Sequence, residues 1–558
     1  MRAIALSLLL ASSFAALAQS SSSMSVSAAP APAEQLGTVS FAQSCAPQVQ
    51  AEFNRGVALL HDFWYAEARP QFERIARQDP HCAMAHWGIA MSVFQQIWEP
   101  PAKDSMKLGW EEMQKAQSIP APTQRERDYI AALATFYKPG NAGYLERANA
   151  YSAAMGALYH QYPGDVDAGA FYALSLLASE PPSDTSLSHE HAAMAVLAPL
   201  FAKDPDNPGV VHYTIHSCDN PSMARQGLAA AEHYGAIAPS GPHAAHMPGH
   251  IFARLGMWQK DIHAQLASIH ASEVADAHHE KGLFDEPHSY DFLMYAYLQS
   301  GQDASARQVL ARSAAVIDRI AQMPATMADH MGGMAGMTGY YRTKFPVFYA
   351  LEMRNWKAAA ALQPVPGALP SNATMTWWAR AIADGHLRRP QQAQADLQHY
   401  DDAMAAVRKG SQAYIAGSTG VQVQRNEIAA WASFAAGRQQ EALQHMRDAA
   451  DLQDKVGQSE VDIPAREMLG DMLLEMHQPR QALAEYRIAL KLSPNRFNGL
   501  YHAGLAAEQS GDKSAAAGYF TALLQSTGNG AHSARPSLAH AKSFLAAARA
   551  ASTQSAAQ

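Results

Sequence analysis

The chain has 558 residues, of which 48% are hydrophobic and 16% are charged, and its formal net charge is −8. This acidic balance, without any basic patch in the sequence, argues against non-specific binding of nucleic acid. The length would ordinarily indicate several domains, but an array of repeats can reach it with one continuous architecture.

The N-terminus has the features of a secretory signal peptide. Arg2 precedes an apolar run, and Ala16-Leu17-Ala18 forms a small-x-small cleavage site, so we predict a signal peptide over residues 1–18. The apolar run is too short for a comfortable membrane span, and no later uninterrupted apolar stretch reaches that length. We therefore expect a periplasmic or secreted protein without a membrane span.

Residues 19–40 are rich in serine, alanine and proline and have almost no bulky apolar side chains. Such a segment cannot bury enough surface to offset its ordering entropy. We predict a flexible linker there.

The chain has three cysteines, Cys45, Cys82 and Cys218. Export permits a disulfide between Cys45 and Cys82, but the odd number leaves one cysteine over. Cys218 lies two residues after His216, although a buried free thiol that behaves as a small hydrophobe is the commoner role.

Small, aromatic and proline residues recur at the spacing of a thirty-four-residue repeat. Gly470, Tyr486 and Pro494 form one such set, and Gly504 and Phe520 follow one period later. Further sets are Gly56, Ala68, Phe72 and Pro80 near the start, and Ala430, Gly437, Ala442 and Met446 later. The chain therefore resembles tetratricopeptide-repeat proteins over most of residues 49–530. The segments HYTIHSCD and HMPGHIFARLG resemble a group of secreted bacterial members of that family.

The resemblance implies an all-α fold, a tetratricopeptide-repeat superhelix in which antiparallel helix pairs stack into a solenoid with a concave face. The residue types agree with it. Small residues let the two helices of a repeat approach closely, the aromatic residue fills the layer between repeats, and proline ends the second helix.

We predict N-terminal helical repeats over residues 41–205, central repeats with a histidine cluster over 206–320, and a Met/Gly-rich loop over 321–340. C-terminal repeats over 341–530 and a capping helix with a tail over 531–558 complete the chain. The segment EPPSDTS at 180–186 indicates a loop insertion.

Two His-x-x-x-His pairs stand out, His212 with His216 and His246 with His250. Residues four apart share one helix face, so each pair is able to hold a metal ion. Aligned on the repeat, with Leu266 at its buried aromatic position, both pairs fall at the fourth and eighth positions of neighbouring first helices. We therefore predict that they face one layer, either as four ligands of one ion or as two neighbouring half-sites.

The surroundings offer further ligands. His243, His288, Asp291 and Cys218 could join the site as additional ligands or as hydrogen-bond partners of the ligands. An imidazole at the eighth position, which normally takes glycine or alanine, needs partners for both ring nitrogens. The carboxylates that could supply them are Asp219, Asp285, Glu286 and Asp291.

The alternative is that the histidines only pack. Chance pairs are common in a histidine-rich chain, and duplication of a repeat can copy a structural pair. Two pairs at equivalent repeat positions, with more histidines nearby, favour metal binding. No His-Glu-x-x-His sequence supplies the general base of a zinc protease.

A methionine-rich tract, MPATMADHMGGMAGM, spans residues 323–337. Thioethers are soft ligands that select Cu(I), so the tract favours contact with copper, whereas the alternative is a flexible loop whose methionines are only tolerated. The predicted soft-metal contacts are Met327, His330, Met331, Met334 and Met337.

Three functions follow. The first is an exported repeat protein that binds copper or zinc at the histidine cluster, in metal handling or a metal-dependent activity. The second is an interaction scaffold that holds a protein or peptide in its concave groove without metal. The third is a histidine-ligated metalloenzyme, a hydrolase or an oxidase.

Overall fold

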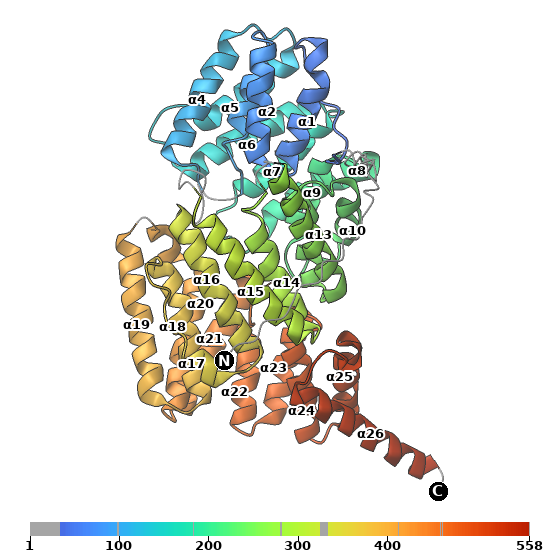
Figure 1. The fold of residues 1–558 in the computed structure, drawn as a ribbon, viewed down its shortest axis with the longest axis vertical. Coiled ribbons are helices and arrows are strands. Elements are labelled where there is room, and N and C mark those ends of the chain that lie inside the picture. Colours follow the sequence, from blue (N-terminus) through green and yellow to red (C-terminus); the bar gives the residue numbers. More distant parts are fainter. Residues whose placement is uncertain are drawn as a thin grey trace, which may run out of the picture. The chain divides into compact units, whose positions relative to one another are not determined.

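The computed structural model describes residues 34–97, 100–181, 184–278, 282–323, 333–410, 412–457, 459 and 461–556. Every regular element in these ranges is a helix, which confirms the all-α prediction (Figure 1). Residues Gln35–Gln558 form one compact unit, and the description below concerns that unit. No helix in its described part combines the length and the hydropathy of a membrane span.

The helices follow one another in three stretches. The first contains α1 (Gln50–His61), α2 (Tyr65–Gln78), α3 (Ala83–Met91), α4 (Lys103–Ser118), α5 (Gln124–Tyr137), α6 (Tyr144–Gln161), α7 (Val166–Ala178), α8 (Ser188–Lys203) and α9 (Pro208–Cys218). The second contains α10 (Leu228–Ile237), α11 (Pro242–His246), α12 (Pro248–Arg254) and α13 (Trp258–Ala277).

The third stretch contains α14 (Glu286–Gln299), α15 (Asp303–Ile320), α16 (Gly333–Glu352), α17 (Trp356–Ala360), α18 (Pro370–His386), α19 (Pro390–Lys409), α20 (Thr419–Ala435), α21 (Gln439–Val456), α22 (Ala465–Glu475), α23 (Pro479–Leu492), α24 (Phe497–Gln509), α25 (Lys513–Ser526) and α26 (Pro536–Ala556). Helix α26 lies where the sequence predicts a capping helix. Helix α16 begins inside the predicted loop 321–340, so that loop is shorter than expected.

The glycine and aromatic positions of the repeat lie against each other. A Cβ atom at Gly470 would lie 2.7 Å from the Tyr486 ring, and one at Gly504 would lie 2.5 Å from the Phe520 ring. Gly56 has the same relation to Phe72, at 2.8 Å. The two helices of these repeats touch where only glycine fits, which explains the spacing read from the sequence.

The segment before α1 differs from the prediction of a free linker. Leu36 and Val39 lie within the predicted linker 19–40, yet both are buried. The backbone N–H groups of Gly37 and Thr38 donate to the carbonyls of Ile237 and Asp206, both over 2.8 Å. These contacts pack residues 36–39 against the helices, because the apolar side chains of Leu36 and Val39 are buried in the hydrophobic core.

The disulfide between Cys45 and Cys82 is present, and Cys218 is a buried free cysteine. The bond joins the segment before α1 to the residue that caps the N-terminus of α3. It is the pairing that the sequence allowed.

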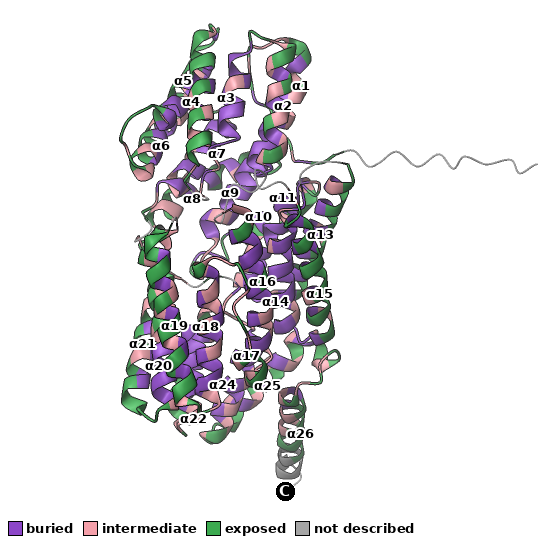
Figure 2. Ribbon diagram, turned by 60° about the vertical axis from the view of Figure 1, so that its left-hand side comes forward, coloured by how far each residue is buried: buried purple, intermediate pink, exposed green. Residues whose placement is uncertain are grey.

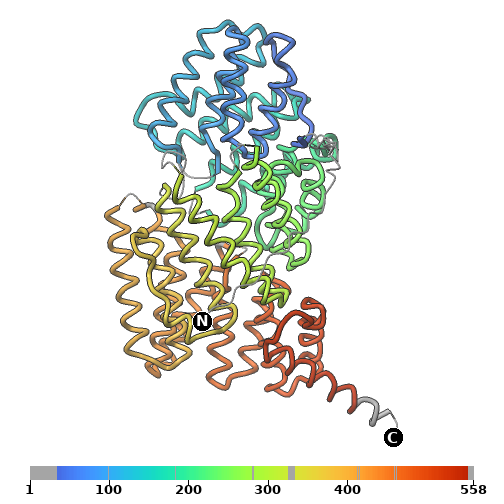
Figure 3. The backbone as a smooth tube through the Cα atoms, in the orientation of Figure 1, coloured from blue at the N-terminus to red at the C-terminus, as the bar shows by residue number. Residues whose placement is uncertain are grey.

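Burial follows the helix faces that meet their neighbours. Helix α15 buries residues at helical spacing from Ala306 to Ile320 and exposes its other side (Figure 2). Along the chain, which can be followed from blue to red in Figure 3, α9 returns to contact α1 and α24 returns to contact α14. We call α14, α16, α18, α20, α22 and α24 the inner helices of the C-terminal series.

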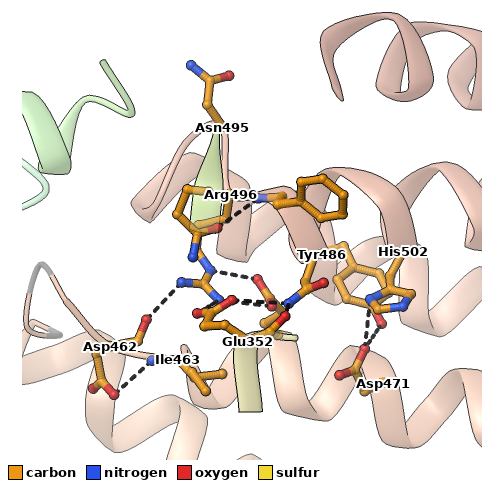
Figure 4. Close-up of polar contacts among 12 residues, drawn as sticks. Glu352, Asp462, Ile463, Asp471, Tyr486, Asn495, Arg496 and His502 are labelled. Carbon is orange, nitrogen blue, oxygen red and sulfur yellow. Dashed lines mark hydrogen bonds and ion pairs between the residues drawn. The ribbon is translucent and has the colours of Figure 1, made fainter. Parts of the chain in front are cut away.

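Arg496, directly before α24, joins three inner helices and is 1% exposed. Its guanidinium pairs with Glu352 of α16 over 2.8 Å (Figure 4) and with Glu467 of α22 over 2.9 Å. It also donates to the Tyr295 hydroxyl of α14 and, over 2.8 Å, to the backbone carbonyl of Asp462. These bonds close the C-terminal series around a polar centre.

Candidate metal centre

The first histidine group forms where α9 meets α11. Asn207 caps the N-terminus of α9 and Pro208 begins it, and His212 and His216 share one face of the helix. His243 of α11 completes the group, and one ligand nitrogen from each of the three rings lies within 4.8 Å of the others. Imidazole nitrogens bind zinc at about 2.0–2.1 Å, so modest ring rotations would bring all three to one ion.

The second histidine group forms between α11, α12 and α14. His246 ends α11, His250 lies on α12 and His288 lies on α14. Their ligand nitrogens also lie within 4.8 Å of one another. The ring centroids of His243 and His246 are 6.0 Å apart, so the two groups are neighbours.

The four histidines predicted from the sequence therefore do not meet at one point. The geometry matches the alternative of two neighbouring half-sites. Each pair is completed by one of the additional residues that the sequence named, His243 for the first pair and His288 for the second.

In the second group, neighbouring acceptors indicate which ring nitrogens of His246 and His250 carry a proton. His250 Nδ1 lies 2.8 Å from Asp219 Oδ2, and His246 Nδ1 lies 2.6 Å from Gln265 Oε1. A carboxylate only accepts, and the Gln265 amide is oriented because its Nε2 donates to Asp261 over 2.8 Å. Both Nδ1 atoms therefore carry a proton, and in the neutral form of each ring the Nε2 atom presents a lone pair.

Those two Nε2 atoms, of His246 and His250, lie 2.8 Å from each other. Two lone pairs repel at this distance unless a cation or a shared proton lies between them. Histidines that bind metals characteristically donate their other N–H to a carboxylate or amide acceptor in this way. Either a shared proton or a bound cation between the two nitrogens would satisfy this arrangement.

The first group has the same pattern at His212. Its Nδ1 lies 2.6 Å from the backbone carbonyl of His61, which only accepts, so Nε2 is the unprotonated nitrogen. That Nε2 is fully buried and has no hydrogen-bond partner within the described residues. Burial lowers the pKa of His212 to about 3 and holds the pKa of His243 well below its usual value. Both rings are therefore neutral, which is the form that binds metals.

One phenylalanine ring lies against each group, and the sequence did not single out either. The Phe63 ring stacks on His216 and His243, each with centroids 5.5 Å apart. The Phe292 ring lies 4.7 Å from His250 and 4.8 Å from His246. Phe63 has a φ of 57°, a strained backbone that persists where surrounding structure holds it.

Two predicted ligands are absent from both groups. Cys218 is fully buried, its Sγ lies 3.5 Å from Met194 Sδ, and burial raises the pKa of its thiol to about 12. The thiol therefore stays protonated and packs as a hydrophobe. Asp291 forms a buried ion pair with Lys344. Neither residue belongs to a histidine group among the described residues, because helical register alone does not show what else each side chain contacts.

The methionine tract is only partly described. Met327, His330 and Met331 lie outside the described residues. Met334 and Met337 lie on α16, where Met337 is buried in the core and Met334 packs against it. These two methionines fill space in an apolar core, so the reason for assigning them to copper is absent.

A cleft of about 1220 Å³ opens beside the first histidine group, and His216, Asp219 and Arg254 form part of its wall. Arg254 donates from Nε to Asp219 over 3.0 Å and so fixes that carboxylate. Glu180 and Glu190 also line the cleft; burial and the charge of Glu190 raise the pKa of Glu180 to about 7. Of the first group, only His216 borders the cleft, and the Nε2 atoms of all three rings are buried.

A family model for the tetratricopeptide repeat matches residues 65–96 and 467–531. The chain contains tetratricopeptide repeats. Repeats of this kind stack into extended binding surfaces and are typical of interaction scaffolds, so proteins are the expected class of partner. No curated protein sequence matches the chain.

Solved structures that match part of the chain include two human IFIT1 dimers, one with m7Gppp-AAAA and one with PPP-AAAA. Each has 11% identity and a TM-score of 0.35, and the match covers 79% of this chain and 90% of that one. The TPR domain of P58(IPK) matches with 14% identity and a TM-score of 0.21, over 69% of this chain and 99% of that one. The bound molecules m7Gppp-AAAA and PPP-AAAA are described for IFIT1 only.

The helices around the histidines lie outside the two matched stretches and depart from the repeat pattern expected from the sequence. The first helix predicted through His246 and His250 is divided into α11 and α12, because Pro248 lacks the N–H that would continue the hydrogen bonding. Leu266, placed by the alignment at the buried aromatic position, is 43% exposed. The histidine rings and Phe292 occupy the layer instead.

Proposed function

We propose that this tetratricopeptide-repeat protein binds transition-metal ions at two adjacent three-histidine sites. The first site consists of His212, His216 and His243, and the second of His246, His250 and His288. The observation that carries the proposal is geometric: the ligand nitrogens of each group lie within 4.8 Å of one another, and His246 Nε2 lies 2.8 Å from His250 Nε2, each a lone pair when the ring is neutral. A metal ion satisfies both lone pairs at once.

The proposed metal is copper or zinc. Neutral imidazoles suit both ions. The methionines that favoured copper over zinc are either buried on α16 or outside the described residues, so the ligand set supports the two equally.

Three protein ligands leave a coordination position for water or another molecule, as in catalytic rather than structural zinc sites. His216 borders a cleft of about 1220 Å³, so we propose that a molecule bound in the cleft lies next to the first site. This supports either metal exchange, as in a handling protein, or a hydrolase or oxidase that acts on a molecule bound in the cleft.

We further propose that the protein works in the periplasm or outside the cell. The support is the predicted signal peptide at residues 1–18, together with the Cys45–Cys82 disulfide, a bond that persists in oxidising compartments.

The test is metal analysis of the full exported chain, purified without chelators. We expect about two ions per chain, about one after His212→Ala/His216→Ala, about one after His246→Ala/His250→Ala, and none when all four are replaced. His263 and His270 are exposed on α13, and His263→Ala/His270→Ala serves as the matched control that keeps both ions.

A wild-type sample that is chelated and then reloaded tests metal binding without substitutions, so its result does not depend on whether the variants fold. Its melting temperature should fall on chelation and recover with copper or zinc, because a ligand that binds only the folded state stabilises it. A chain that binds neither ion and melts at one temperature throughout would refute the proposal.

That same result would favour the second candidate, an interaction scaffold without metal, which the tetratricopeptide repeats at 65–96 and 467–531 support. The partner would be a protein or peptide. Arg496 and its partners occupy part of the centre of the C-terminal series, so a bound peptide would have to pass beside this buried cluster.

A further inference from the structure

A cavity of about 480 Å³ lies among inner helices of the C-terminal series. It belongs to none of the histidine sites. One part of its wall is apolar, and the side chains that form this part are Met375, Met404, Ile415, Val421 and Val423. Its volume falls in the range typical of small-molecule sites, about 300–1,000 Å³.

Two carboxyl groups, of Glu427 and Asp462, line another part of the wall. Glu427 is 2% exposed and accepts a hydrogen bond from Trp378 Nε1 over 2.6 Å. Asp462 accepts from the backbone N–H of Ile463 over 2.8 Å and, more weakly, from Gln453 Nε2 over 3.4 Å. The cavity therefore has an apolar side and an acidic side.

The cations near this cavity are engaged elsewhere. Arg496 pairs with Glu352 and Glu467, and Lys344 pairs with Asp291. Among the described residues, no lysine, arginine or histidine nitrogen lies within 4.0 Å of a carboxylate oxygen of Glu427 or Asp462, although Lys344 and Arg496 act on Asp462 at longer range.

Burial without a close cation disfavours the ionised form of Glu427 and Asp462 in the protein without a ligand. It raises the pKa of Glu427 to about 8, with a contribution from Asp462, and the pKa of Asp462 to about 6. Buried carboxyl groups are ordinarily paired or neutralised. A cation that entered the cavity would allow both groups to ionise beside it.

We infer that this cavity binds a small organic cation, an ammonium group on an apolar stem. The ammonium contacts the carboxylates of Glu427 and Asp462, and the stem packs on Met375 and Met404. The chemistry follows from the two parts of the wall, and the volume selects a small molecule over a length of polypeptide. The inference is independent of the metal sites.

The probe is n-pentylamine, and the control compound is n-pentanol, which has a similar stem and no charge. Both are titrated into the full chain after chelation, while calorimetry measures the heat of binding. We expect saturable binding of the amine and binding of the alcohol about tenfold weaker or undetectable. Equal binding of the two compounds would overturn the inference.

Variants assign the binding to the cavity. Glu427→Gln/Asp462→Asn keeps the shape of the wall and should weaken amine binding by about tenfold or more, since one partner of a charge pair is lost. Asp396 is a buried carboxylate paired with Arg380 and lies outside the cavity wall, so Asp396→Asn should bind the amine as wild type does. Undiminished binding by the double variant would place the amine elsewhere.

A second variant, Met375→Trp, tests the same cavity if the double variant does not fold. It fills the apolar side and leaves both carboxyl groups in place, so it should abolish saturable binding while circular dichroism confirms a helical chain. Retained affinity in a folded Met375→Trp protein would contradict the inference by itself.

Discussion

Single buried carboxyl groups control how the stability of this protein depends on pH. Burial raises the pKa of Glu427 from 4.5 to about 8, so the folded chain keeps a proton that the unfolded chain releases. Stability then decreases as pH rises from about 4.5 to about 8, by up to about 1.4 kcal/mol per pH unit.

We expect Glu427→Gln, which cannot ionise, to remove the contribution of this group and leave that of the other buried carboxyl groups, such as Asp462 and Glu180. Its free energy of unfolding should match that of wild type near pH 4 and exceed it near pH 8, measured by urea denaturation at both values. Glu73 pairs with Arg69 on the surface of α2, and Glu73→Gln should leave the pH dependence nearly unchanged. Parallel curves for wild type and Glu427→Gln would contradict the expectation.

At the same scale, Gln265 positions a proposed ligand without touching the metal. Its Oε1 accepts from His246 Nδ1, so Gln265→Leu should weaken zinc binding by about 10–100-fold. Competition with a chromophoric chelator measures the affinity. Gln259, which is exposed on the same helix, supplies the control Gln259→Leu, and equal losses in both variants would show that the bond is unimportant.

At the scale of elements, the contact between two helices of one repeat depends on glycine. A Cβ at Gly470 would lie 2.7 Å from the Tyr486 ring, so Gly470→Ala should destabilise the chain by about 1–3 kcal/mol. A Cβ at Gly518 on α25 would meet nothing within 4 Å. Gly518→Ala should therefore be neutral or stabilising by about 1 kcal/mol, through helix propensity; urea denaturation compares the two.

The same elements show what the sequence can predict. The repeat follows from local spacing, since Gly470 and Tyr486 belong to one helix pair. His212 with His216 follows from helical geometry, and so does His246 with His250. The contacts that surround these pairs do not follow. Phe63 lies between α1 and α2, far from His216 in the sequence, and Gln265 reaches His246 from α13 through packing that helical spacing within one helix does not show. Pro248 indicates in the sequence that the helix is divided into α11 and α12, whereas the spacing of His246 and His250 predicts one continuous helix.

At the scale of the whole compact unit, one arginine holds the C-terminal series closed. Arg496→Met would leave Glu352 and Glu467 buried without their cation, and we expect a loss of about 3–5 kcal/mol in the free energy of unfolding. Arg425 pairs with Asp401 on the surface, where its side chain is 50% exposed, and Arg425→Met should cost less than about 1 kcal/mol. Similar midpoints for the two variants in thermal unfolding would show that the centre contributes little.

Helix α11 has five residues and supplies a histidine to each site, His243 to the first and His246 to the second. An ion in one site would therefore fix the orientation of α11, on which the other site also depends. The conformational entropy of α11 would then be lost on binding of the first ion and not again on binding of the second. Loading should then be cooperative: native mass spectrometry of a half-titrated sample should contain fewer singly loaded chains than independent sites would give. A statistical distribution would mean that each ion arrives without effect on its neighbour.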